Sequence, residues 1–287
     1  MKISKIYDKN ETVLSCEVFP PKPEKSIDPT IFKSLKKLKP HFISVTYGAG
    51  GGTKSKTVEM VDEIKNNFNM ETLMHLTCID STSRSIKKIL SQLKKKNIEN
   101  ILALRGDIPK GKNPNELIYD FKYASDLVKF IKRKNRFSLG VAGYPEKHPQ
   151  ASSYEKDIQN LKYKVTCGAD FIITQLFFNN DFFYKFIDTI RSNGIQVPVS
   201  AGIMPVFRAG LVKKMVQMCG ASIPSKLRNL IEKYKNKPED MEKAGIDYAT
   251  AQVHELINSD TLQGIHIYTM NRPRLAKAIV KKSGLKQ

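Results

Sequence analysis

Glu17 is the residue best suited by type and setting to transfer a proton. It lies in the run Leu14-Ser15-Cys16-Glu17-Val18-Phe19, directly before Pro20-Pro21. A carboxyl removed from water favours its protonated form, and a protonated carboxyl is what a general acid needs. The same residue could instead form an ion pair with a lysine at the rim of the fold. The residues alone give these two interpretations equal weight.

Asp107 is a second acidic candidate, and it follows Arg105-Gly106. A glycine at this point lets a ligand approach the backbone, while the two opposite charges could contact a polar ring edge and a phosphate. A tight turn with a local ion pair explains the same three residues. The glycine-rich residues 48–53 suggest an anion-binding loop, but they match neither the dinucleotide fingerprint nor the P-loop, which favours a flexible loop.

A predicted helix carries polar residues along one side. Asp157, Asn160 and Lys164 recur at helical spacing, so they share a face that could bind a ligand. A solvated face is the favoured interpretation, because the apolar residues between them can face inward.

Metal and covalent-nucleophile chemistry find no support in the sequence. The five histidines include no His-Glu-x-x-His pair, and His75 stands in an apolar strand, where a hydrogen-bonded core histidine is the common finding. The four cysteines are scattered and form no Cys-x-x-Cys, so reduced and mostly buried thiols are expected. No Gly-x-Ser-x-Gly is present. We therefore expect neither a metal site nor a covalent hydrolase.

The elements that must position these residues alternate between short apolar runs and longer amphipathic segments, which is typical of parallel strands with crossover helices. The runs predict eight strands, at residues 13–19, 42–47, 72–78, 100–105, 137–144, 171–177, 197–204 and 264–270. Asp28-Pro29, Asn113-Pro114 and Arg272-Pro273 predict helix starts, and residues 225–234 and 238–258 predict two extra helices before strand eight. Eight units favour an α/β fold of the (β/α)8 TIM-barrel class over an open doubly wound sheet. In such a barrel the chemistry lies at the carboxyl ends of the strands, where Glu17 and Asp107 stand.

Bulk composition suits one soluble domain. The chain has 287 residues, with 40% hydrophobic and 26% charged, and no run long and apolar enough for a membrane helix, which predicts a cytoplasmic protein without membrane contact. The formal charge of +20 allows a nucleic-acid surface, but the lysines are scattered over the whole chain. We therefore favour a lysine-rich exterior and expect no nucleic-acid partner.

Taken together, the motifs resemble those of the methylenetetrahydrofolate reductase family. The resemblance spans nearly the whole chain and preserves order and spacing. It rests on Glu17-Val18-Phe19-Pro20-Pro21, Val45-Thr46-Tyr47-Gly48-Ala49, His75-Leu76-Thr77-Cys78, Ala103-Leu104-Arg105-Gly106-Asp107, Tyr144-Pro145-Glu146-x-His148-Pro149, Ile173-Thr174-Gln175 and Tyr268-Thr269-x-Asn271-Arg272. Each motif alone is modest, but the ordered set is specific.

The resemblance implies that residues 1–287 form one catalytic domain that binds FAD across the barrel mouth. The positions matching flavin contacts are Thr46, Tyr47, Ala49, His75, Arg105, Gly106, Asp107, Tyr123, Ala124, Tyr144, His148, Ala151, Asp157, Asn160 and Lys164. Thr46 and Gln175 match positions near the nicotinamide and the pterin, and Arg272 matches a folate-binding position. Glu17 matches the general acid, and Asp107 matches the acidic group against the flavin ring and the folate.

The implied activity is reduction of 5,10-methylenetetrahydrofolate to 5-methyltetrahydrofolate with NADH or NADPH, and the implied assembly is a homo-oligomer. Tyr163, Leu211 and Met215 depart from the residues of bacterial members, which leaves a phosphate contact, the folate tail and the electron donor open. A partner subunit that delivers the electrons is the alternative donor. The resemblance also predicts no regulatory extension after the barrel. Other interpretations are a proline-dehydrogenase-like barrel flavoprotein and a basic nucleic-acid-binding barrel.

Overall fold

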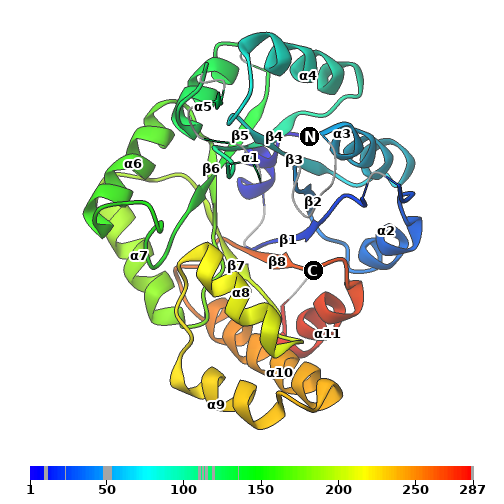
Figure 1. The fold of residues 1–287 in the computed structure, drawn as a ribbon, viewed down its shortest axis with the longest axis vertical. Coiled ribbons are helices and arrows are strands. Elements are labelled where there is room, and N and C mark those ends of the chain that lie inside the picture. The colour runs from blue at the N-terminus through cyan, green and yellow to red at the C-terminus, as the bar shows by residue number, and fades with distance from the viewer. Residues whose placement is uncertain are drawn as a thin grey trace.

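The protein, seen here in a computed structural model, is described over residues 1–9, 12–22, 24–47, 54–108, 111, 113, 116–117, 120–134 and 136–285. Eight parallel strands close into a barrel in chain order, and Figure 1 shows them inside a ring of helices. The strands are β1 Val13–Val18, β2 Phe42–Val45, β3 Thr72–Thr77, β4 Asn100–Leu104, β5 Ser138–Gly143, β6 Phe171–Thr174, β7 Val199–Ile203 and β8 Gly264–Tyr268. The predicted (β/α)8 barrel is therefore confirmed, and the open sheet is excluded.

Helices cover the outside of the barrel. They are α2 Pro29–Lys36, α3 Lys54–Asp62, α4 Ser83–Lys95, α5 Ala124–Lys132, α6 Tyr154–Thr166, α7 Asn180–Ser192, α8 Ala209–Cys219, α9 Ser225–Tyr234, α10 Pro238–Ile257 and α11 Pro273–Ser283, and a π-helical turn, η2 Glu63–Asn67, extends α3. The two extra helices predicted before strand eight are α9 and α10. Asp28 begins α2 by accepting a hydrogen bond from the Thr30 backbone, as the Asp-Pro signal predicts.

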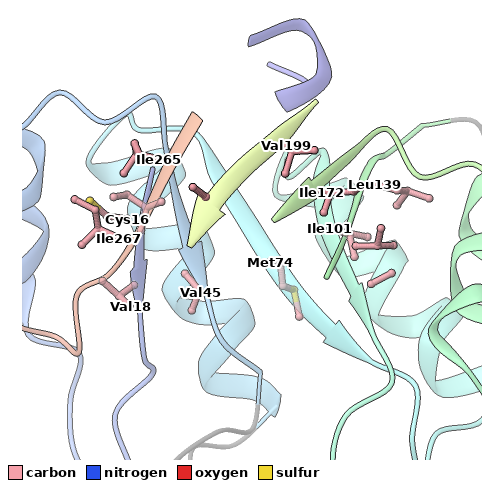
Figure 2. Packing of buried hydrophobic residues seen from close by; sticks show 14 of the residues in the cluster. Cys16, Val18, Val45, Met74, Ile101, Leu139, Ile172, Val199, Ile265 and Ile267 are labelled. Atoms are coloured by element: carbon pink, nitrogen blue, oxygen red, sulfur yellow. The ribbon is translucent and has the colours of Figure 1, made fainter. Parts of the chain in front are cut away.

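The main hydrophobic core lies between the barrel and these helices. Successive side chains of a strand point to opposite faces, so alternate residues such as Cys16, Val18 and Val45 point outward. Figure 2 shows this layer of apolar side chains, with Met74, Ile101, Leu139, Ile172 and Val199 continuing it around the barrel. Full burial of each such side chain stabilises the fold by roughly 1.5–3 kcal/mol before entropy is counted.

A short helix, α1 Ile3–Tyr7, closes the amino-terminal end of the barrel and was not predicted. The backbone N–H of Ile3 donates to Asn100 Oδ1 at 2.7 Å, and the Tyr7 hydroxyl lies 2.7 Å from Ser200 Oγ. Asn100 begins β4 and Ser200 lies near the start of β7. Five residues are too few for a helical pattern to show in the sequence, and this one depends on polar partners far along the chain.

The barrel interior is apolar near α1 and polar at the opposite end. One buried cluster joins α1 to the lower interior, and it consists of Ile3, Ile6, Tyr7, Val13, Phe42, Leu73, Leu102, Phe171 and Ile173. Gly140 belongs to this layer, because a Cβ there would lie 2.4 Å from the Phe171 ring. Above it, the inward positions of β1, β3 and β8 carry Glu17, His75 and His266, all buried. The carboxyl and imidazole groups of this layer thus lie toward the carboxyl ends of the strands.

Several predicted boundaries were wrong. All eight strands end before the predicted residue: β6 stops at Thr174 instead of continuing to residue 177, since Phe177 leaves the sheet and stacks on Phe183 of α7. The helix after β4 begins at Ala124, so Asn113-Pro114 does not start it. Within the described ranges, no helix is long and apolar enough to cross a membrane, and no group of acidic, His and Cys side chains is suited to hold a metal. The four cysteines are free thiols, as expected.

Candidate active site

The Glu17 carboxyl lies between two imidazoles at the carboxyl end of the barrel. Its Oε2 is 3.5 Å from His75 Nε2 and 3.6 Å from His266 Nε2. The three residues are 5%, 6% and 0% exposed. These separations indicate polar contact and not fully made hydrogen bonds, so the carboxyl can still turn toward a ligand. Since the polar partners of the Glu17 carboxyl in the described structure are histidines, the lysine pair considered from the sequence was wrong.

His266 is anchored by two serine hydroxyls. Ser15 Oγ lies 2.8 Å from Nδ1, and Ser44 Oγ lies 3.5 Å from Nε2. The ring also packs edge-on against Tyr268, with centroids 5.1 Å apart and planes at 90°. Sequence reasoning missed His266 and Ser15. The alternation of strand side chains could have indicated them, because residues two apart share a face of the strand. Ser15 precedes Glu17 by two residues, and His266 precedes Tyr268 by two.

His75 is held neutral by its surroundings. Burial lowers its pKa to about 4, while the Glu17 charge opposes the shift and His266 adds to it. Its Nε2 makes no hydrogen bond to any described residue. His75 therefore offers an uncharged polar edge toward Glu17, which is more than the core histidine favoured from sequence.

The ends of β1 and β8 are locked together beside Glu17. Thr269 Oγ1 donates to the Glu17 carbonyl at 2.6 Å. The Asn271 side chain accepts from the Phe19 N–H at 2.8 Å and donates to the Phe19 carbonyl at 2.9 Å. Met270 and Asn271 have φ of +52° and +54°, a left-handed turn that ends β8 and brings the Asn271 amide back to β1. This fixes the Glu17 backbone relative to the loop that carries Arg272.

Arg272 is positioned by an aromatic ring. Its guanidinium carbon lies 4.6 Å from the centroid of Phe207, which follows β7 and is buried. The cation–π contact orients the guanidinium without consuming its hydrogen-bond donors. The N–H groups of the guanidinium are therefore suited to bind a carboxylate.

A second group of polar side chains lies at the ends of β5 and α6. The His148 N–H donates to Asp157 Oδ2 at 2.8 Å, and the His148 ring packs edge-on against Tyr144 at 4.6 Å. Lys164 Nζ donates to the Ala142 carbonyl at 2.6 Å. Burial lowers the pKa of Lys164 to about 8, and the Asp157 charge opposes the shift. A desolvated ammonium of this kind is suited to bind an anion.

Beside this group lies a cavity of about 480 Å³ lined by Ile79, Arg105, Ile108, Lys122, Tyr123 and Gln150. Arg105 Nη1 donates to Gln150 Oε1. Apolar, aromatic and cationic walls together suit a flat ring system that carries phosphate.

The structure brings most of the predicted site residues to one end of the barrel. Thr46 continues β2 and is buried, and its Oγ1 has no hydrogen-bond partner among the described residues. Gln175 lines a small pocket with Tyr144 and Cys219. Gly106 has a φ of +86°, and a Cβ there would lie 2.8 Å from Thr77, which explains the glycine before Asp107.

Other predicted residues lie farther out. Asp107, Tyr123 and Asn160 are exposed. Tyr123 also lines the 480 Å³ cavity. Tyr47 is buried, whereas Ala124 and Ala151 are partly buried near helix starts. Ala49 and the glycine-rich residues 48–53 lie outside the described residues.

Comparison with known proteins gives consistent matches. A family model described as methylenetetrahydrofolate reductase matches residues 2–284. A 5,10-methylenetetrahydrofolate reductase of Salmonella typhimurium is 36% identical, over 95% of this chain and 91% of its own. Methylenetetrahydrofolate reductase (NADH) 1 of Arabidopsis thaliana is 35% identical over 99% of this chain and 50% of its own, so the chain spans about half the length of the plant relatives it matches.

A solved structure is similar in fold. An uncharacterized Clostridium thermocellum protein, described as binding two copies of 5-methyl-5,6,7,8-tetrahydrofolic acid, superposes with a TM-score of 0.67. It is 14% identical, and the match covers 98% of this chain and 96% of that one. At this identity the likeness shows the barrel fold alone.

Neutral burial of His75 predicts a pH dependence of stability. Its pKa in the folded protein, about 4, lies below the ordinary 6.5, so its contribution is full above pH 6.5 and is lost as pH falls toward 4. Between pH 6.5 and 4, the free energy of unfolding of His75→Gln should therefore fall by on the order of 3 kcal/mol less than that of the wild type. Urea unfolding at several pH values measures it. His254→Gln, on the exposed face of α10, is the control, and equal pH slopes for wild type and both variants would contradict the assignment.

Proposed function

The chain belongs to the methylenetetrahydrofolate reductase family, and we propose that it is itself an FAD-dependent enzyme that reduces 5,10-methylenetetrahydrofolate to 5-methyltetrahydrofolate. Flavin-dependent reduction of methylenetetrahydrofolate is the function of this family. The observation that carries the proposal is the Glu17 carboxyl, buried at the catalytic end of the barrel and in contact with His75 and His266. We propose that residues 1–287 act as one FAD-binding catalytic domain.

The residues along β4, β5 and α6 fit a flavin dinucleotide. Arg105 and Lys164 would hold the diphosphate, because one lines the 480 Å³ cavity and the other is a desolvated cation behind β5. Tyr123 would form an aromatic wall at the same cavity. Thr46 Oγ1, without a hydrogen-bond partner among the described residues, can contact a polar ring edge. Bound FAD, once reduced by the nicotinamide donor, would supply the hydride that reduces the methylene carbon.

The work left to the chain is to bind the folate and to move one proton. The bond between the methylene carbon and the departing nitrogen breaks more easily when that nitrogen receives a proton. Glu17 would donate it and become a carboxylate. Gln175 would bind the pterin, and the Arg272 guanidinium on Phe207 would bind a folate carboxylate. Asp107, exposed at the end of β4, would lie against the flavin and the folate, where its negative charge would tune the reduced ring.

The electron donor is the open part of this proposal. NADH or NADPH is the proposed donor, and the Arabidopsis relative carries NADH in its name. Leu211 and Met215 both lie on α8, and Met215 packs against the apolar cluster beneath that helix. Donation by a partner subunit, a homo-oligomeric assembly and a cytoplasmic location stay predictions.

Substitution of Glu17 by Gln tests the function. It keeps the side-chain volume but removes the acidic proton, so folate reduction should fall on the order of 10²–10⁴-fold while flavin reduction by the nicotinamide donor is unchanged. Stopped-flow absorbance of the flavin follows the two half-reactions separately. Equal loss of both would indicate a binding or folding role for Glu17 in place of a proton donor.

Lys164 predicts how flavin binding depends on pH. A lysine with a pKa of about 8 is charged below that pH and loses its charge above it, so FAD affinity should be constant below pH 8 and fall by up to about tenfold per pH unit above it. Titration of apoprotein with FAD, followed by flavin fluorescence, measures this.

Two variants isolate the lysine charge. Lys164→Met should bind FAD weakly without the inflection near pH 8, whereas Lys164→Arg should keep tight binding and also lose the inflection, because a guanidinium stays charged. The same affinity and profile in wild type and both variants would show that Lys164 does not contact the diphosphate.

A further inference from the structure

His266 faces Glu17 through one ring nitrogen and Ser15 through the other. Ser15 Oγ lies 2.8 Å from Nδ1, and Glu17 Oε2 lies 3.6 Å from Nε2. Ser15 and His266 are 0% exposed. The contact depends on closure of the barrel, because Ser15 of β1 pairs in register with His266 of β8.

The hydrogen bonds of Ser15 favour one tautomer of the His266 imidazole. Ser15 has a single O–H, and it donates to the Ile265 carbonyl at 3.3 Å. With the O–H on that carbonyl, the Ser15 oxygen accepts from His266 at 2.8 Å, which assigns the ring proton to Nδ1. Ser44 Oγ lies 3.5 Å from Nε2, a long contact that fits either tautomer. Ser15 therefore favours Nδ1–H with the lone pair on Nε2.

Three described groups whose pKa responds to the Glu17 charge are themselves uncharged near neutral pH. From β3, His75 has its pKa lowered to about 4 by burial. From β8, burial and then the Glu17 charge raise the pKa of Tyr268. From the end of α8, burial raises the pKa of Cys219 to about 12, with Asp107 and Glu17 adding to the shift. None of these groups is a cation that would favour an ionised Glu17. Whether His266 Nε2 donates to the carboxyl or accepts from it therefore becomes important for the protonation of Glu17.

We propose that His266, fixed by Ser15 as the Nδ1–H tautomer, is a positioning residue that keeps the catalytic proton on Glu17. The 3.6 Å contact is longer than a hydrogen bond, but when the carboxyl turns toward the ring, the unprotonated Nε2 can accept from the protonated carboxyl and has no proton to offer the carboxylate. The opposite tautomer would donate Nε2–H to the carboxylate and favour loss of the proton. This inference rests on the proposed acid role of Glu17, and the tautomer itself can be measured without any activity.

The tautomer is measured by NMR of the wild-type chain labelled with [15N]histidine. Long-range proton–nitrogen correlations distinguish a protonated ring nitrogen from an unprotonated one, and the signals absent from His266→Gln identify His266. We expect Nδ1 protonated and Nε2 unprotonated. A protonated Nε2 in the wild type would overturn the proposal, whatever the variants do.

The functional consequence is measured in Ser15→Ala, which removes the acceptor for Nδ1–H. Folate reduction needs a protonated Glu17, so the alkaline limb of its pH profile should move to lower pH, with a loss on the order of tenfold at pH 8 for a shift of about one unit. Flavin reduction by the nicotinamide donor should keep its wild-type profile. Ser15→Thr, which restores a hydroxyl, should restore the folate profile, and His254→Gln should leave it unchanged.

Failure of this inference and failure of the proposed function give different results. Wild-type protein that binds flavin but never exchanges electrons with a folate contradicts the proposed function, and the NMR result still decides the tautomer. An active wild type whose pH profile is unchanged in Ser15→Ala contradicts the role of His266 alone. An equal loss of the folate-reduction rate at every pH would likewise contradict it. A merely structural defect lowers that rate without moving the alkaline limb of the pH profile.

Discussion

The placement of one carboxyl and two imidazoles inside a barrel is the constraint on which the rest of the structure depends. Polar groups of this kind are costly to remove from water, so a sequence tolerates them in a core only where each has a partner. Here the amino-terminal half of the interior is apolar and closed by α1, whereas the carboxyl-terminal half carries Glu17, His75 and His266. The apolar layer gives the fold its stability, and the polar layer can then be used for chemistry.

The positions of these groups depend on strands and on hydrogen bonds between strand ends. Glu17 and His266 belong to paired strands, and Thr269 and Asn271 tie the segment after β8 to β1. Arg272 follows immediately and rests on Phe207. A site built on regular elements in this way is held more closely than one built on loops, which suits proton transfer to a defined atom.

Much of the fold was predictable because it follows from patterns within short segments. Strand alternation and helix periodicity predicted eight strands and the helices α9 and α10, and the rule for parallel barrels placed Glu17 and Asp107 at the catalytic end. Contacts between distant segments were not predictable. Ser15 meets His266 only because the barrel closes, and α1 is held by hydrogen bonds to Asn100 and Ser200 from distant strands. The helix start predicted at Asn113-Pro114 was wrong for α5. Asp126 accepts hydrogen bonds from the backbone N–H groups of Lys122 and Tyr123, and this sets the start of α5 at Ala124.

The central claim is that Glu17 is retained for proton transfer and adds little to stability. The most direct test is the free energy of unfolding of Glu17→Gln against wild type, from urea denaturation near neutral pH. Because the carboxyl is buried and has only long contacts to two imidazoles, the amide should leave stability within about 1 kcal/mol of wild type or raise it. A loss of about 3–5 kcal/mol, as when a structural buried ion pair is broken, would contradict the account.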